Sequence, residues 1–160
     1  MPARTTEGVL HQLLLVQMLL LGGGTLFSTY TLFGQLYDFH ALHGTIFRFA
    51  DTFTQNPLLT PCFFGTCAFI IGFTASLVLL MRFTLRDERW LRNFLIFGVC
   101  FAALVLVYEA CEYFKWIHFA TSVSCAPGVH PLQSPCFTGF VFFILSALCA
   151  QVIVRKAHST

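Results

Sequence analysis

The chain has 160 residues, of which 57% are hydrophobic and only 10% are charged. Because a soluble domain usually carries about 25% charged residues, this composition excludes an ordinary soluble protein and predicts an integral membrane protein with one domain over residues 1–160. The net charge of +2 is too small to indicate a nucleic-acid partner, so the lipid bilayer is the expected partner.

Four apolar segments are long enough to cross the bilayer, which takes roughly 20 residues. They are predicted at about 9–33, 58–81, 93–115 and 134–154. Three of them contain no acidic residue, lysine or arginine, and the third has no charge before Glu109. This is expected because each charge near a helix centre costs roughly 2.5–3.5 kcal/mol on insertion scales. The predicted fold is an all-α bundle of four transmembrane helices.

The basic residues predict the orientation of these helices. Seven of the nine lie on one side of the predicted bundle, namely Arg4, Arg82, Arg86, Arg89, Arg92, Arg155 and Lys156. The positive-inside rule therefore places both termini in the cytoplasm, and the expected location is a bacterial inner membrane.

The loop after the first predicted span has a regular apolar pattern. Apolar residues recur every three or four positions from Leu36 to Phe53, which predicts a short amphipathic helix in the outer interface. The alternative is a packed re-entrant loop. The same loop carries Asp38, His40 and His43, which are candidate ligand-binding residues.

The second and fourth predicted spans open with nearly the same nonapeptide. Residues 57–65 read PLLTPCFFG and residues 131–139 read PLQSPCFTG, so six of nine positions are identical. Chance self-matching of a Phe-rich sequence explains scattered apolar pairs better than it explains these six identities. The motif therefore predicts that one segment of the chain was duplicated.

The offset of 74 residues between the two motifs extends over both halves without a gap. It also relates Gly24 to Gly98, Asp38 to Glu112, Phe69 to Phe143 and Arg82 to Lys156. A constant offset is typical of a duplicated unit. We therefore expect two tandem helical hairpins, with repeats at about 9–82 and 83–156.

Three cysteines near the outer face are candidate redox thiols: Cys62, Cys136 and Cys125. Cys62 and Cys136 fall in the first turn of their helices, after the predicted N-cap residues Thr60 and Ser134. Unpaired N–H groups and the helix dipole favour a thiolate there. Cys62–Cys136 and Cys125–Cys136 disulfides are both compatible with the sequence. The alternative is that each motif cysteine only packs as a small apolar residue.

Two acidic residues lie near the outer end of the third predicted span. Glu109 and Glu112 are three residues apart and share a helix face. An acid inside a membrane span indicates a functional site, whereas an acid at headgroup level does not. With Asp38, His40 and His43, they are predicted to contribute to an outward-facing cysteine and acidic centre.

The layout of spans and cysteines is similar to that of the DsbB and vitamin K epoxide reductase families. Cys62 and Cys67 open the second span, and Cys125 and Cys136 precede and open the fourth. The resemblance implies that the outer cysteines exchange electrons with an extracytoplasmic thiol protein and a quinone. It covers topology rather than motif, because those families carry a C-x-x-C pair and this chain has C-x-x-x-x-C at 62–67.

Three functions fit this sequence, which contains no recognisable catalytic motif. The sequence favours a non-enzymatic component, meaning an accessory subunit or a small-solute handling protein that associates with other membrane subunits. The second function is a membrane thiol–disulfide oxidoreductase. The third is a metal-ion carrier, since thiolates and imidazoles suit copper or zinc, although no C-x-x-C or H-x-x-x-H spacing predicts metal ligands.

Overall fold

The computed structural model describes residues 3–45, 56–116 and 128–158, and in these residues the chain is helical without strands. The elements are α1 (Ala3–His43), η1 (Pro57–Leu59), α2 (Pro61–Met81), α3 (Leu85–Tyr113), η2 (Pro131–Gln133) and α4 (Pro135–His158). The two η elements are single 3-10 turns that directly precede α2 and α4. The prediction of an all-α protein is confirmed.

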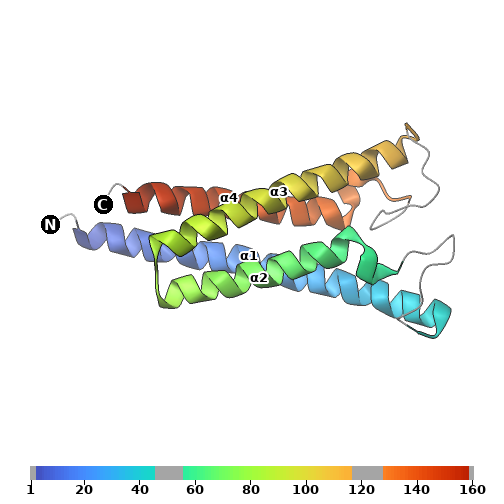
Figure 1. Cartoon of the computed structure of the whole chain (residues 1–160), viewed down its shortest axis with the longest axis horizontal. Helices are drawn as coiled ribbons and strands as arrows, with labels where there is room; N and C mark the ends of the chain where they lie inside the picture. The colour runs from blue at the N-terminus through green and yellow to red at the C-terminus, as the bar shows by residue number, and fades with distance from the viewer. Residues whose placement is uncertain (1–2, 46–55, 117–127, 159–160) are drawn as a thin grey trace.

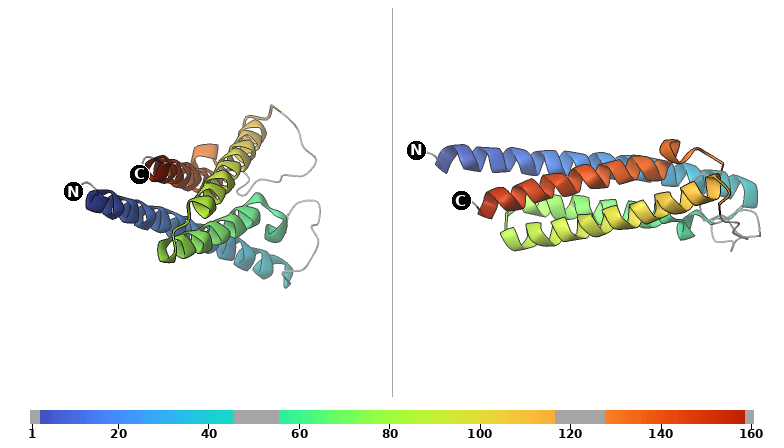
Figure 2. Two further views of the ribbon diagram at one scale, coloured as in Figure 1. Left: turned by 60° about the vertical axis from the view of Figure 1, so that its left-hand side comes forward. Right: turned by 90° about the horizontal axis from the view of Figure 1, so that it is seen from above.

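The four α-helices lie side by side in one elongated bundle (Figure 1, Figure 2). Each contains a segment long and apolar enough to cross a membrane, which confirms the four predicted apolar helices. Both chain ends lie at the same end of the bundle, here named the terminal end. The opposite end, where α2 and α4 begin, is named the cysteine end.

The first helix is longer than predicted. Residues 34–43 continue α1 without a break, so a separate interfacial helix in this segment is not confirmed. The other part of that prediction, 46–55, lies outside the described residues. The 41 residues of α1 span roughly 60 Å, about twice the thickness of the hydrocarbon core. Part of α1 therefore has to extend beyond the apolar layer.

The third helix begins at Leu85, eight residues before its predicted start at 93. The Thr84 Oγ1 atom accepts a hydrogen bond from the Asp87 N–H at 3.2 Å, which caps the first turn. Glu88 and Leu91 in the following turn are both completely buried. The charged segment before residue 93, which lies outside the predicted third span, is therefore the amphipathic start of α3.

A buried polar contact joins α1 and α3 toward the terminal end. The Gln17 Nε2 atom donates a hydrogen bond of 3.2 Å to Glu88 Oε1, and both side chains are 0% exposed. Nearby, the Cys149 thiol of α4 donates to the Leu13 carbonyl of α1 at 3.4 Å. These contacts fix three helices relative to one another where the spans are otherwise apolar.

The middle of the bundle is built from two matching glycine–phenylalanine contacts. The rings of Phe69 in α2 and Phe143 in α4 stack with centroids 4.1 Å apart. The Phe69 ring packs on Gly24 of α1, and the Phe143 ring packs on Gly98 of α3. Small residues let neighbouring helices approach closely in membrane proteins. These four residues therefore set the helix spacing on both sides of the bundle.

Replacing Gly98 with alanine should destabilise the bundle by about 1–3 kcal/mol. A Cβ atom at this position would lie 2.7 Å from Cε1 of Phe143. The ring has little room to move, because it is buried and stacked against Phe69. The measurement is the free energy of unfolding in mixed detergent and SDS micelles.

The control for this substitution is Gly34→Ala in α1, where an added Cβ atom meets nothing within 4 Å. It should be neutral or slightly stabilising, since alanine is favoured over glycine in a helix. Equal losses at positions 34 and 98 would contradict the close packing of Gly98.

Candidate functional site

The cysteine end contains the same backbone turn twice. In the first copy the Asn56 side chain accepts a hydrogen bond from the Leu58 N–H at 2.9 Å. In the second, His130 Nδ1 accepts from the Leu132 N–H at 3.3 Å. Each side chain stabilises a single 3-10 turn that leads into a long helix. The two nonapeptide motifs therefore fold alike and place their cysteines at equivalent positions.

The two residues predicted as N-caps behave differently. Ser134 Oγ accepts a hydrogen bond of 3.2 Å from the Phe137 N–H, as a capping side chain does. Thr60 is the N-cap residue of α2 as predicted, but its hydroxyl donates to the Pro57 carbonyl at 2.7 Å and makes no cap bond. The hydroxyl is therefore satisfied by the preceding turn, while the helix still begins after Thr60.

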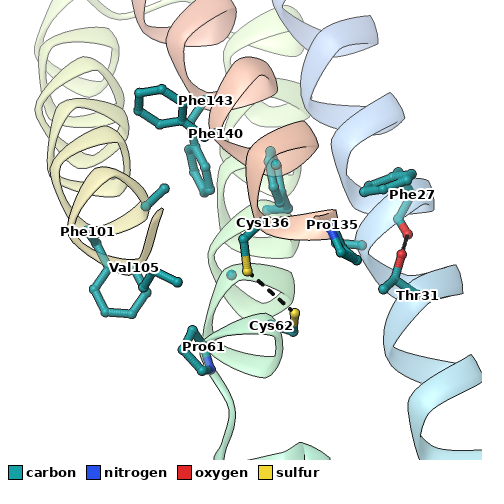
Figure 3. Close-up of a pocket in the computed structure, with 15 residues that line it drawn as sticks. Phe27, Thr31, Pro61, Cys62, Phe101, Val105, Pro135, Cys136, Phe140 and Phe143 are labelled. Atoms are coloured by element: carbon teal, nitrogen blue, oxygen red, sulfur yellow. Dashed lines mark hydrogen bonds between the residues drawn. The ribbon is translucent and has the colours of Figure 1, made fainter. Parts of the chain in front are cut away.

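The two motif cysteines meet although they are 74 residues apart. Their Sγ atoms lie 3.9 Å from each other, with Cys62 on α2 and Cys136 on α4 (Figure 3). Cys136 takes part in no disulfide, so neither the Cys62–Cys136 nor the Cys125–Cys136 disulfide is formed in this structure. Cys62 takes part in a disulfide. Cys125 lies outside the described residues.

A polar side chain contacts each of the two sulfur atoms. Gln35 of α1 points its Nε2 atom at Cys62 Sγ, 3.9 Å away. Glu109 of α3, only 5% exposed, is hydrogen-bonded to the Cys136 thiol. Because the thiol carries the hydrogen, it donates and the carboxyl oxygen accepts. The site thus contains one sulfur next to an amide and one next to a carboxyl group.

A small cavity of about 60 Å³ lies against the two sulfur atoms. All four helices contribute to its wall, which is nearly all apolar and includes the rings of Phe27, Phe101 and Phe140 (Figure 3). One buried water needs roughly 10–15 Å³ on this scale, so the cavity has room for a few waters or a small group. The sulfur atoms therefore face a confined and largely apolar space.

A larger groove of about 560 Å³ runs between α2 and α3 and adjoins this cavity. The two share four lining residues: Pro61, Gly65, Phe101 and Phe143. The outer part of the groove includes Phe64 and Phe97, which are exposed on the surface of the bundle. An apolar molecule in the lipid could therefore reach the neighbourhood of the sulfur atoms.

The other predicted site residues do not line the cavity. Asp38 and His40 are exposed, and His43 packs against the Phe39 ring with centroids 4.6 Å apart. Glu112 is half-buried on α3. Among the described residues, no group of three or more His, Cys, Asp or Glu side chains could hold a metal ion. A ligand-binding role for these four residues stays a prediction.

Gln35 is the site residue that the sequence analysis missed. Gln35 and Glu109 are 74 residues apart in the sequence, which is also the separation of Cys62 and Cys136. The full alignment of the two halves would have paired them. No protein-family model, curated protein or solved structure matches this chain.

Proposed function

We propose that the protein is a membrane thiol–disulfide oxidoreductase in which Cys136 and Cys62 form the exchange centre. The observation that carries this proposal is the distance of 3.9 Å between the sulfur of Cys136, which is in no disulfide, and the disulfide-bonded sulfur of Cys62. Thiol–disulfide exchange needs this pair of groups in contact. A cysteine that only packed in a turn would need neither the second sulfur nor a carboxyl partner.

The exchange step conserves atoms and electrons. The Cys136 thiol loses its proton, and the thiolate attacks Cys62 Sγ. A new S–S bond of about 2.05 Å forms between Cys136 and Cys62. The earlier disulfide bond of Cys62 breaks, and its other sulfur leaves as a thiolate that takes up a proton. No external oxidant is needed for this rearrangement.

Net turnover joins this step to a donor and an acceptor of two electrons. We propose an extracytoplasmic dithiol protein as the donor and a lipid-soluble quinone as the acceptor. Oxidation of the dithiol to a disulfide releases two electrons and two protons, which convert a quinone to a quinol. The α2–α3 groove suits such a molecule, because its volume of about 560 Å³ lies in the usual range for ligand sites and aromatic rings line it.

The proposed orientation and origin of the bundle agree with this function. With both termini in the cytoplasm of a bacterial inner membrane, the cysteine end faces the extracytoplasmic side, where disulfides persist. The matching turns and the two glycine–phenylalanine contacts support two duplicated hairpins. Duplication would explain how two equivalent cysteines came to lie in contact.

Disulfide mapping tests the proposed function. Membranes are treated with an alkylating reagent that blocks free thiols, and the digested protein is examined by mass spectrometry. The wild-type protein should contain a Cys62–Cys136 disulfide together with a second Cys62 disulfide, in proportions that change with added dithiol or quinone. Cys125, the third predicted redox thiol, is the first candidate to be examined as the partner in the second species.

The matched variants are Cys136→Ser and Cys149→Ser. Cys136→Ser should hold Cys62 in the second disulfide and reduce the oxidation of a dithiol peptide by a soluble quinone to the uncatalysed rate. Cys149→Ser changes a buried thiol on the same helix and should keep both properties. Absence of a Cys62–Cys136 disulfide under every redox condition would reject the proposal. Co-purified subunits or bound metal would then favour an accessory subunit or a metal carrier.

A further inference from the structure

A buried polar pair toward the terminal end has apolar residues at its matching positions in the other half of the chain. Gln17 of α1 and Glu88 of α3 are both 0% exposed, and one hydrogen bond of 3.2 Å joins their side chains. The positions 74 residues away from them are Leu91 and Leu14, which belong to the buried apolar core. Leucine therefore suffices for packing at these positions, and the polar pair calls for a different explanation.

Each of the two polar side chains has one buried oxygen atom without a donor. In the Glu88 carboxyl group, Oε1 accepts the hydrogen bond from Gln17 Nε2, and Oε2 has no partner among the described residues. The Gln17 Oε1 atom has none among them either. A buried acceptor without a donor is costly, because it has lost its hydrogen bonds to water. A stable arrangement therefore needs a donor at this pair.

No positive charge of the described residues reaches Glu88. The nearest basic residue on the same face of α3 is Arg92, one turn further on, and its guanidinium group donates to Asn93 Oδ1 and Gln151 Oε1 instead. On α4 the Cys149 thiol donates to a backbone carbonyl of α1. The other described titratable side chains at this end of the four helices are exposed: His11, Arg82, Arg86, Asp87, Arg89, Arg155, Lys156 and His158.

We propose that Gln17 and Glu88 form a proton-binding site toward the terminal end of the bundle, in which Glu88 is a neutral carboxylic acid in the folded protein. The bound proton makes Oε2 a donor, and Gln17 Oε1 supplies an acceptor on the neighbouring amide group. One proton thus serves both unpartnered oxygens and removes the buried charge. The inference does not depend on the proposed exchange function, because the sulfur atoms lie at the cysteine end.

The bound proton links the stability of the bundle to pH. An ionised Glu88 would be a buried charge without a cation, which is far more costly than the neutral acid. In an unfolded chain a glutamate loses its proton at about pH 4.3. Above this pH the folded protein binds one proton more than the unfolded chain, so stability falls as the pH rises. For one proton, the unfolding equilibrium constant should rise by up to about tenfold for each pH unit.

Infrared difference spectroscopy of the full-length protein in mild detergent at neutral pH tests the protonation directly. A protonated carboxyl group has a carbonyl band that is separate from the bands of carboxylates and shifts in D2O. The difference between the wild-type protein and Glu88→Gln should contain this band. Asp87→Asn changes the neighbouring exposed acid and should leave the band in place. Wild-type and Glu88→Gln spectra without a difference in this band would overturn the inference.

The second measurement is the unfolding equilibrium constant in mixed detergent and SDS micelles, followed from about pH 5 upward. The ratio of the wild-type constant to that of Glu88→Gln should rise with pH, by up to about tenfold for each unit. Groups other than Glu88 titrate in both proteins and cancel in this ratio. A ratio that stays constant over the whole pH range would contradict a proton held by Glu88.

The double variant Gln17→Leu, Glu88→Leu copies the residues at the matching positions. Replacing both hydrogen-bonding partners by apolar groups is often nearly neutral, so this variant should fold. Its unfolding should follow the pH dependence of Glu88→Gln, and a dependence like that of the wild-type protein would overturn the inference. Wild-type stability that depends on sodium at constant ionic strength, without the carbonyl band, would also overturn it, because a cation would then occupy the site.

Discussion

Phe69→Ala should lower the free energy of unfolding by about 3–5 kcal/mol, the largest stability loss that we expect from a single substitution in this bundle. The Phe69 ring is 2% exposed and stacks on Phe143 while it also packs edge-on against Phe142. Its removal leaves a cavity in the middle of the bundle, where no other side chain can replace the ring contacts. Unfolding in mixed detergent and SDS micelles measures the loss.

Phe64→Ala is the matched control for this prediction. Phe64 lies on the same helix and is 54% exposed, so most of its ring faces the lipid or the α2–α3 groove. Its loss should cost less than about 1 kcal/mol, because few protein contacts disappear. If the two substitutions had equal effects, Phe69 would not be the central packing residue of the bundle.

Glu88→Ala should cost about 2–4 kcal/mol of stability through a different cause. The substitution leaves the buried Gln17 side chain without its partner, which costs about 1–3 kcal/mol, and it creates a small cavity that adds roughly 1 kcal/mol. The Glu88 Oε1 atom is the acceptor for Gln17 Nε2 at 3.2 Å, and both residues are completely buried. The same unfolding measurement in mixed micelles applies.

Glu88→Gln separates the hydrogen bond from the charge. Glutamine keeps the volume and can still accept a hydrogen bond from Gln17, so the loss should stay below about 1 kcal/mol. An ionised carboxylate that is buried without an ionic partner is costly, and the described residues offer Glu88 none. If Glu88→Gln were as damaging as Glu88→Ala, a charge at this position would be essential and the hydrogen-bond explanation would be wrong.

The sequence predicted the number of helices well, because the apolar segments are long and nearly free of charge. It placed the start of α3 too late, since the segment from Leu85 to Arg92 contains five charged residues. Of these, Arg86, Asp87 and Arg89 are exposed, while Glu88 and its neighbour Leu91 are buried. Composition averages over a helix and does not reveal such a one-sided pattern near a membrane boundary.

The candidate site could be predicted in part. The repeated motif identified Cys62 and Cys136, and the position of the acidic Glu109 within an apolar span marked it as a candidate site residue. The contact between the two sulfurs depends on how α2 and α4 meet, which no local pattern specifies. Gln35 carries no charge and fits no motif, so only the offset from Glu109 could have revealed it.

The most direct test of this account is a cross-linking experiment on a variant that keeps only Cys62 and Cys136. Trypsin cleaves after the arginines of segment 82–92, which comprises the α2–α3 turn and the first turns of α3, and separates the two hairpins. After mild oxidation in membranes, the two halves should stay joined without reductant and separate when reductant is added. A variant with only Cys67 and Cys136 should not cross-link, because Cys67 lies about 7.5 Å further along α2. Separation of the halves in both variants would show that Cys62 and Cys136 do not form one centre.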